Sequence, residues 1–105
     1  ANELFNNANQ SMGVELGTTG VTSPGDFESY GPRGAVAIDR LVSEHNHEVL
    51  WTDCTRRGFI KLILTRDSTQ VDYIAVDTVS SEEYVASLVR RMEITKKDGS
   101  LVFED

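Results

Sequence analysis

The stretch FIKLILTRDSTQVDYIAVD, which runs from Phe59 to Asp77, decides the fold that this sequence predicts. Residues 59–65 are mostly apolar, as in a strand that is covered on both faces, and residues 70–77 alternate as a second strand does. Residues 66–69 between them have the chemistry of a turn. Because so few residues separate the two runs, they are predicted to form an antiparallel hairpin.

A second antiparallel hairpin is predicted at the C-terminal end of the chain. The strand-like segment 88–95 is followed by Asp98-Gly99, a strong hairpin turn signal, and then by the short apolar run 101–103. A helix over residues 82–92 is the alternative for the first part of this region. Residues 80–83 read Ser-Ser-Glu-Glu, which can cap one short helical turn.

Upstream of these hairpins the hydrophobic period changes to that of a helix. Between Ala35 and Asn46 the apolar residues recur at helical spacing, which predicts an amphipathic helix of about three turns. Asn46 suits the position just past its end. Residues 26–34, which contain glycines and a proline, are interpreted as a linker.

Further strands are predicted over residues 12–23, which Pro24-Gly25 stops, and over residues 48–52. Residues 6–11 are polar and predict a loop. The predicted fold class is therefore α+β, with one main amphipathic helix and about six mostly antiparallel strands.

The amino-acid composition of the chain argues against some classes of binding partner. The 105 residues suffice for one small domain, and 17 acidic against 10 basic residues give a net charge of −7. That charge argues against nucleic acid and against anionic membranes, since both bind clustered cations. The single Cys54 excludes an internal disulfide framework and a CxxC zinc site, and no apolar run is long enough for a transmembrane helix.

The start of the chain has no Met and no charged segment followed by an apolar core, so we expect no signal peptide within these residues. The opening residues 1–5 look like a cut rather than a natural N-terminus. We therefore expect the chain to be a piece of a larger protein.

Three groups of side chains are candidates for chemistry. His45 and His47 are suitable metal ligands, but residues at i and i+2 do not share a helix face, so a helix terminus is favoured over a metal site. Cys54 beside either histidine would suggest a nucleophile and base, although a structural thiol is favoured. Three acidic residues of the middle region, Asp53, Asp72 and Asp77, could include a paired-carboxylate site. The favoured interpretation is that they are unrelated acids in strands and turns.

Two further stretches have side chains that suit a bound anion or ligand. Arg56-Arg57 suits phosphate through guanidinium forks, although such pairs more often make salt bridges, and Arg90-Arg91 receives the same interpretation. The stretch TTGVTSPG, residues 18–25, places hydroxyls and glycines at the end of a predicted strand. Loops at strand ends often hold ligands, while a hydroxyl-rich edge strand and turn is the alternative.

Several of these segments together resemble a known family. The order and spacing of four stretches resemble those of the alkaline phosphatase D-like metallophosphoesterases. These stretches are ANEL at residues 1–4, VELGTTGVTSPG at residues 14–25, EHNHEVLWTD with RRGF at residues 44–53 and 56–59, and VDYIAVDTV at residues 71–79. The likeness covers residues 1 to about 80. Residues 81–105 are typical of the family in character only.

The resemblance implies an enzyme that hydrolyses phosphomonoesters and phosphodiesters with calcium and iron, on an αββα sandwich. It also implies that the metal ligands lie upstream of this chain, so that no catalytic or metal-binding residue is assigned here. Cys54 does not match the metal-binding cysteine of the family, and His45 and His47 match positions that are not ligands. The residues expected at the rim of the substrate site are Thr19, Thr22 and Ser23.

The sequence thus predicts that residues 1–105 are one segment, the C-terminal part of a secreted or periplasmic bacterial phosphatase that acts on a phosphate ester. Its partner would be the remainder of the parent polypeptide, and the segment alone would be inactive and would tend to dimerise through exposed edges. No cofactor, nucleic acid or membrane is expected to bind this segment. The alternative function is a free-standing β-rich binding or accessory module.

Overall fold

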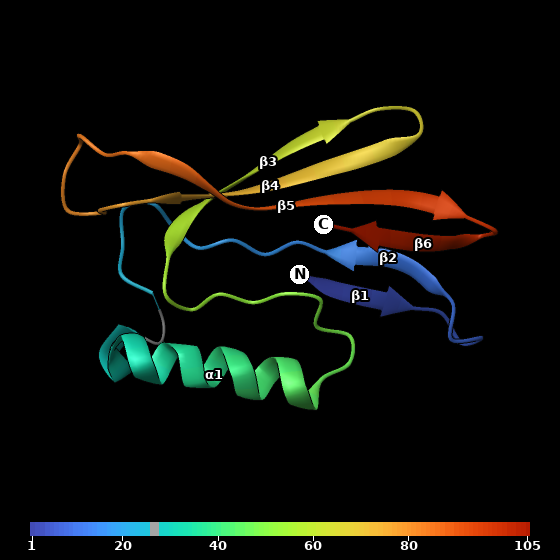
Figure 1. Cartoon of the computed structure of the whole chain (residues 1–105), viewed down its shortest axis with the longest axis horizontal. Helices are drawn as coiled ribbons and strands as arrows, with labels where there is room; N and C mark the ends of the chain where they lie inside the picture. Colours follow the sequence, from blue (N-terminus) through green and yellow to red (C-terminus); the bar gives the residue numbers. More distant parts are fainter. Residues whose placement is uncertain (26–27) are drawn as a thin grey trace.

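The computed structural model describes residues 1–25 and 28–105 (Figure 1). Within these residues, six strands, one 3₁₀-helix and one α-helix give an α+β fold in which every strand pairing is antiparallel, as predicted. The elements in chain order are β1 (Asn2–Phe5), β2 (Ser11–Glu15), η1 (Glu28–Tyr30), α1 (Gly31–His45), β3 (Arg57–Leu64), β4 (Ser68–Val76), β5 (Ala86–Lys97) and β6 (Ser100–Glu104).

The four-stranded sheet has the order β3-β4-β5-β6, so both predicted hairpins are confirmed. Asp98 and Gly99 both have positive φ, 51° and 83°, which is the conformation that a tight hairpin turn requires. The alternative helix over residues 82–92 is wrong, because β5 begins at Ala86 and residues 80–83 form no helical turn. Pairing with β4 along the length of β5 outweighs the local helix signal.

The β1–β2 hairpin forms the second sheet, and two of the predicted strands need correction. The strand predicted over residues 12–23 ends at Glu15, and the strand predicted over residues 48–52 is reduced to an isolated bridge between Asn2 and Val49. The loop predicted over residues 6–11 is confirmed for residues 6–10. Next to this bridge, the Glu3 N–H donates to the Glu48 carbonyl and the Leu50 N–H to the Ala1 carbonyl. The Val49 N–H instead donates to the Asn46 carbonyl at 3.0 Å, in the turn after α1.

Helix α1 begins earlier than predicted. Residues 31–34, which were interpreted as linker, form its first turn, because Pro32 stands in that turn, where its fixed φ is already helical and no N–H is needed. Residues 26–27 of the same linker lie outside the described residues. The helix ends at His45, and the N–H of Asn46 donates to the carbonyl of Val42 at 3.1 Å.

The core lies on one face of the central strands β4 and β5. Its buried residues are Val71, Tyr73, Met92 and Ile94. They are covered by partly buried residues that include Val14 of β2, Leu16 just after it, and Leu50 and Trp51. The prediction that residues 59–65 are covered on both faces is wrong, because β3 is an edge strand and several of its large apolar side chains are exposed. Figure 1 shows the β3–β4 turn at the margin of the molecule.

The chain exposes more surface than a folded protein of its mass usually does. Its accessible surface is 7411 Å², whereas a mass of 11.6 kDa corresponds to about 5,800 Å² for a globular monomer. Its radius of gyration is 15.2 Å, against about 13 Å for a compact chain of this length. The excess means that apolar faces of the sheet and helix remain uncovered.

Candidate functional site

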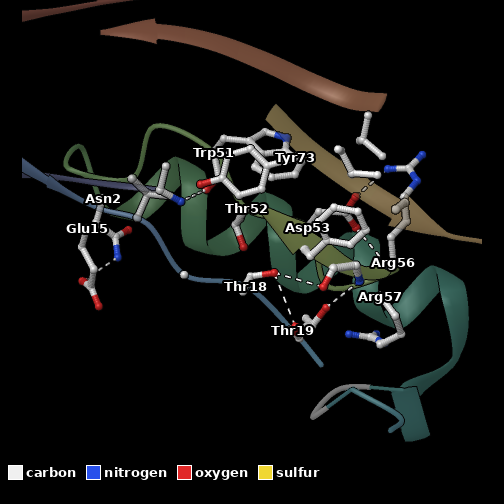
Figure 2. Close-up of a pocket in the computed structure, with 18 of the residues that line it drawn as sticks. Asn2, Glu15, Thr18, Thr19, Trp51, Thr52, Asp53, Arg56, Arg57 and Tyr73 are labelled. Atoms are coloured by element: carbon white, nitrogen blue, oxygen red, sulfur yellow. Dashed lines mark hydrogen bonds and ion pairs between the residues drawn. The ribbon is translucent and has the colours of Figure 1, made fainter. Parts of the chain in front are cut away.

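A cleft of about 400 Å³ opens between three parts of the chain that are far apart in sequence. One wall is the segment from Gly17 to Thr19, the second is the segment from Val49 to Asp53, and the floor is formed by β3 and β4. Figure 2 shows Thr18 and Thr19 of the first wall below Trp51, Thr52 and Asp53 of the second wall.

Two threonines close one end of the cleft on the backbone of β3. The Thr18 hydroxyl donates to the Gly58 carbonyl at 3.2 Å, and the Gly58 N–H donates to the Thr19 hydroxyl at 3.1 Å. The two hydroxyls therefore do what a neighbouring strand would do for one residue of the sheet edge (Figure 2). Gly58 is required here, because a Cβ on it would lie 1.9 Å from the Ile74 carbonyl oxygen.

Of the three residues predicted at the rim of a substrate site, the structure brings one to the cleft. Thr19 lines it, whereas Thr22 and Ser23 are exposed and stand apart from the described residues that line it. The turn that follows them is nevertheless close to the site. The guanidinium of Arg57 packs directly against Gly25, where a Cβ would lie 2.2 Å from it, and donates to the Cys54 carbonyl at 3.0 Å.

Asp53 organises the turn between the second wall and β3. Its carboxylate accepts hydrogen bonds from the N–H and hydroxyl of Thr55, at 2.8 and 2.6 Å, and from the Arg56 guanidinium. Burial acts to raise the pKa of Asp53, but the hydrogen bonds from Thr55 and Arg56 outweigh it and keep that pKa below its ordinary value. Arg56 therefore serves first as the partner of Asp53.

Asp39 on α1 holds the same turn from the opposite side. Both of its carboxylate oxygens accept from the Cys54 N–H at 2.9 Å, and one accepts from the Thr52 hydroxyl at 3.2 Å. Burial, with the neighbouring Asp39, raises the pKa of the Cys54 thiol to about 11. A thiol with that pKa is almost fully protonated at neutral pH, which fits a structural cysteine rather than a nucleophile.

The histidines stand outside the cleft and are not brought to Cys54. The His45 ring contacts the Leu41 carbonyl at 2.9 Å near the end of α1, as the helix-terminus interpretation predicts. His47 lies 3.5 Å from Glu48 and stacks obliquely near Phe5. Among residues 1–25 and 28–105, no cluster of three or more His, Cys, Asp or Glu side chains is placed to hold a metal ion.

The remaining acidic and basic candidates are separated rather than assembled. Asp72 forms a bidentate ion pair with Arg91, at 2.7 and 2.9 Å, and Arg90 pairs with Asp105. The Asp77 carboxylate accepts from the Val85 N–H at 2.8 Å. Each carboxylate thus has its own partner on a different part of the sheet, and the paired-carboxylate hypothesis has no geometric support in the described residues.

Sequence reasoning missed the aromatic part of the cleft. The rings of Trp51 and Tyr73 meet edge to face with centroids 4.5 Å apart, and the Arg90 guanidinium lies 5.7 Å from the Trp51 ring centre. The Tyr73 hydroxyl is buried without a hydrogen-bond partner in the described part of the chain, and burial raises its pKa. The alternation of residues 70–77 could have predicted part of this arrangement, because it places Tyr73 on the core side with Val71.

In comparisons with known proteins, no family model, no curated protein and no solved structure matches this chain. Among the described residues, no helix has the length and apolar character needed to cross a membrane.

Proposed function

We propose that this chain is the C-terminal segment of a metal-dependent phosphatase or phosphodiesterase similar to alkaline phosphatase D, and that it shapes one side of the substrate site. Its partner would be the remainder of that polypeptide, and its substrate a phosphate ester. The parent enzyme would be periplasmic or secreted. Because the cleft lacks an assembled nucleophile and base among the described residues, the segment supplies binding surface rather than the reacting groups.

The observation that carries this proposal is the composition of the cleft wall. The four stretches that resemble the family make up about two fifths of the chain, yet they provide all the described lining residues except Val42 and Val89. The fold thus brings stretches that are tens of residues apart in sequence together at one cleft. Their convergence supports a shared site with the Thr18–Thr19 pair at one end.

The residues of this chain do not fit the calcium and iron that the resemblance implies. No described cluster of ligand side chains would hold either ion, and both histidines are outside the cleft. When bound elsewhere in the parent, those metals would polarise the phosphoryl group and activate a hydroxide. The role proposed for this segment is therefore limited to orienting the ester and limiting the access of water.

The excess surface of the chain is consistent with a segment that is completed by more protein. Large apolar side chains remain exposed on α1 and before β5, for example Leu41 and Val85. Exposed apolar residues in this number are typical of surfaces that other parts of a protein cover.

The test compares the chain alone with a polypeptide that also contains the coding sequence upstream of Ala1. With calcium and iron present, the longer polypeptide is expected to hydrolyse bis(p-nitrophenyl) phosphate, and the chain alone is expected to show only background. Turnover by the chain alone, or an inactive longer polypeptide, contradicts the proposal. The upstream sequence is also expected to contain Gly-Asp-x-His-x-x-Trp, the motif that in the resembled family shortly precedes the stretch similar to residues 1–4.

Variants in the longer polypeptide test the rim residues. Thr19→Ala is expected to raise KM by about two- to tenfold with a smaller effect on kcat, because Thr19 lines the cleft and a rim contributes binding more than chemistry. Ser80→Ala, at an exposed site outside the cleft, is the matched control. If the longer polypeptide is inactive while the chain alone is a stable monomer, the free-standing binding module is favoured instead.

A further inference from the structure

The outer edge of β3 has backbone groups that no described part of the chain satisfies beyond Gly58. In an antiparallel ladder, alternate residues direct their N–H and C=O to the same side. The contacts of Gly58 with Thr18 and Thr19 show that its groups point outward. The regular register with β4 then directs the groups of Ile60, Leu62 and Leu64 outward too.

The side chains along this edge are unusually apolar for an exposed strand. Leu62 is 49 % exposed and Leu64 is 72 % exposed, and both lie on the core-facing side of the sheet. Lys61 is the one charged residue between Phe59 and Leu64. Edge strands are normally protected by charges, prolines, bulges or a covering element. Lys61 is the main protection that this strand has, since its ladder with β4 shows no bulge.

We propose that β3 pairs antiparallel with β3 of a second copy of this chain, about a twofold axis that passes through Leu62. The two four-stranded sheets would then join into one continuous sheet. Ile60 of one copy would lie opposite Leu64 of the second copy, and Leu62 opposite Leu62 of the second copy. The stripe formed by these leucines and isoleucines would be shielded from water, which is the driving force for association. This inference does not depend on the proposed phosphatase function.

Steric and charge arguments favour this register over the one with the axis at Lys61. An axis at Lys61 would place the two Lys61 side chains directly opposite each other, which is unfavourable for like charges. It would also pair Leu64 with Gly58 of the second copy, whose edge is already occupied by Thr18 and Thr19. With the axis at Leu62, Lys61 lies opposite Ile63 of the second copy, and pairing stops before the threonines.

The net charge of −7 opposes association of two copies in general. The edge itself carries no acidic residue, since the strand contains only Arg57 and Lys61 as charged groups. Long-range repulsion between the two copies is screened by salt, whereas the apolar contact is not. The dimer is therefore expected to become more stable as sodium chloride is raised.

Sedimentation equilibrium of the chain tests the association. We expect a reversible monomer–dimer equilibrium that Leu62→Lys weakens by about tenfold or more, because it places two like charges opposite each other at the axis. Leu88→Lys is the matched control, since Leu88 is 52 % exposed but lies on β5, away from this edge. Circular dichroism of both variants establishes that the sheet remains folded.

Disulfide cross-linking tests the register in a Cys54→Ser background. L62C is expected to form a homodimeric disulfide under mild oxidation, because residues paired across the axis lie about 5.5 Å apart at Cα, within the range that a disulfide spans. L64C is the control, since it is more exposed but lies opposite residue 60 of the second copy.

Faster cross-linking at L64C than at L62C would overturn the register. A chain that remains monomeric at all concentrations, or a dimer that Leu62→Lys and Leu88→Lys weaken equally, would overturn the proposal itself.

Discussion

The hydroxyl of Thr19 accepts a hydrogen bond from the backbone N–H of Gly58 at 3.1 Å, across 39 residues of sequence. With the reciprocal bond from Thr18 to the Gly58 carbonyl, this contact ends the open edge of β3 and closes the cleft at the same point. One small piece of backbone thus connects the candidate site with the proposed dimer edge.

Removing the Thr19 hydroxyl is expected to destabilise the fold measurably. Thr19→Val keeps the shape of the side chain but leaves the Gly58 N–H without its acceptor, which costs about 1 kcal/mol. The free energy of unfolding in urea measures this loss. Thr22→Val is the control, since Thr22 is exposed and its hydroxyl makes no hydrogen bond in the described residues. Equal stability of the two variants would contradict the role assigned to Thr19.

A methyl group on Gly58 is expected to be far more damaging than one on Gly17. The Cβ of Gly58→Ala would meet the Ile74 carbonyl at 1.9 Å, so β3 and β4 must separate, at a cost of roughly 3 kcal/mol. Gly17→Ala meets nothing within 4 Å and is expected to be neutral or slightly stabilising. Thermal unfolding of both variants provides the measurement, and similar melting temperatures would refute the strand geometry.

Asp39→Ala is expected to loosen α1 from the turn that carries Cys54. It removes the acceptor of the Cys54 N–H and of the Thr52 hydroxyl, which costs about 1–3 kcal/mol where the donor stays partly buried. Hydrogen exchange of the Cys54 amide is the direct measurement. Ser43→Ala, on the exposed part of the same helix, is the control, and unchanged exchange in Asp39→Ala would contradict the contact.

Cys54 is expected to be a slow thiol. With its pKa raised to about 11 by burial and by Asp39, it has about a hundredfold less thiolate at pH 8 than a cysteine of pKa 9. The rate of alkylation by iodoacetamide in the folded chain, compared with the chain unfolded in urea, tests this. Asp39→Ala is expected to increase the rate, whereas rapid alkylation of the folded parent chain would exclude the raised pKa.

Acidification is expected to weaken the sheet through Asp72. Hydrogen bonds and charge from Arg91 lower the pKa of Asp72 in the folded state. The carboxylate therefore contributes stability that is fully present above its unfolded pKa, near 3.8, and is lost as the pH falls through the lower folded value. The free energy of unfolding in urea, measured between about pH 6 and about pH 2, tests this loss, because that range roughly brackets the pKa of an aspartate.

Asp72→Asn is expected to reduce the loss of folding stability at acidic pH. Asp67→Asn is the control and is expected to leave that loss unchanged, because the Asp67 carboxylate accepts no hydrogen bond in the described residues. An identical pH dependence in Asp72→Asn and in the parent chain would show that the Arg91 pair does not couple folding to protonation.

Part of the site could be predicted from the sequence, because some of its residues are recognisable from their type and their immediate neighbours. Thr19, Arg57 and Asp53 were candidates on residue type and position, and the structure places all three at the cleft. Trp51 and Tyr73 were missed as a pair because their contact at 4.5 Å joins a loop to a strand. The histidines and Cys54, which are close in sequence, are not brought together: His45 contacts the Leu41 carbonyl near the end of α1, and the Cys54 N–H donates to Asp39.

The sequence by itself determined the two hairpins of the main sheet and the antiparallel α+β class, because alternation and turn residues act over a few neighbouring positions. Only the tertiary structure decided that residues 16–23 leave the ladder and that residues 48–52 form a single bridge. It also decided that β3 lies at an uncovered edge. Those outcomes depend on which distant segments satisfy the backbone and cover the apolar face, and periodicity contains no information about that choice.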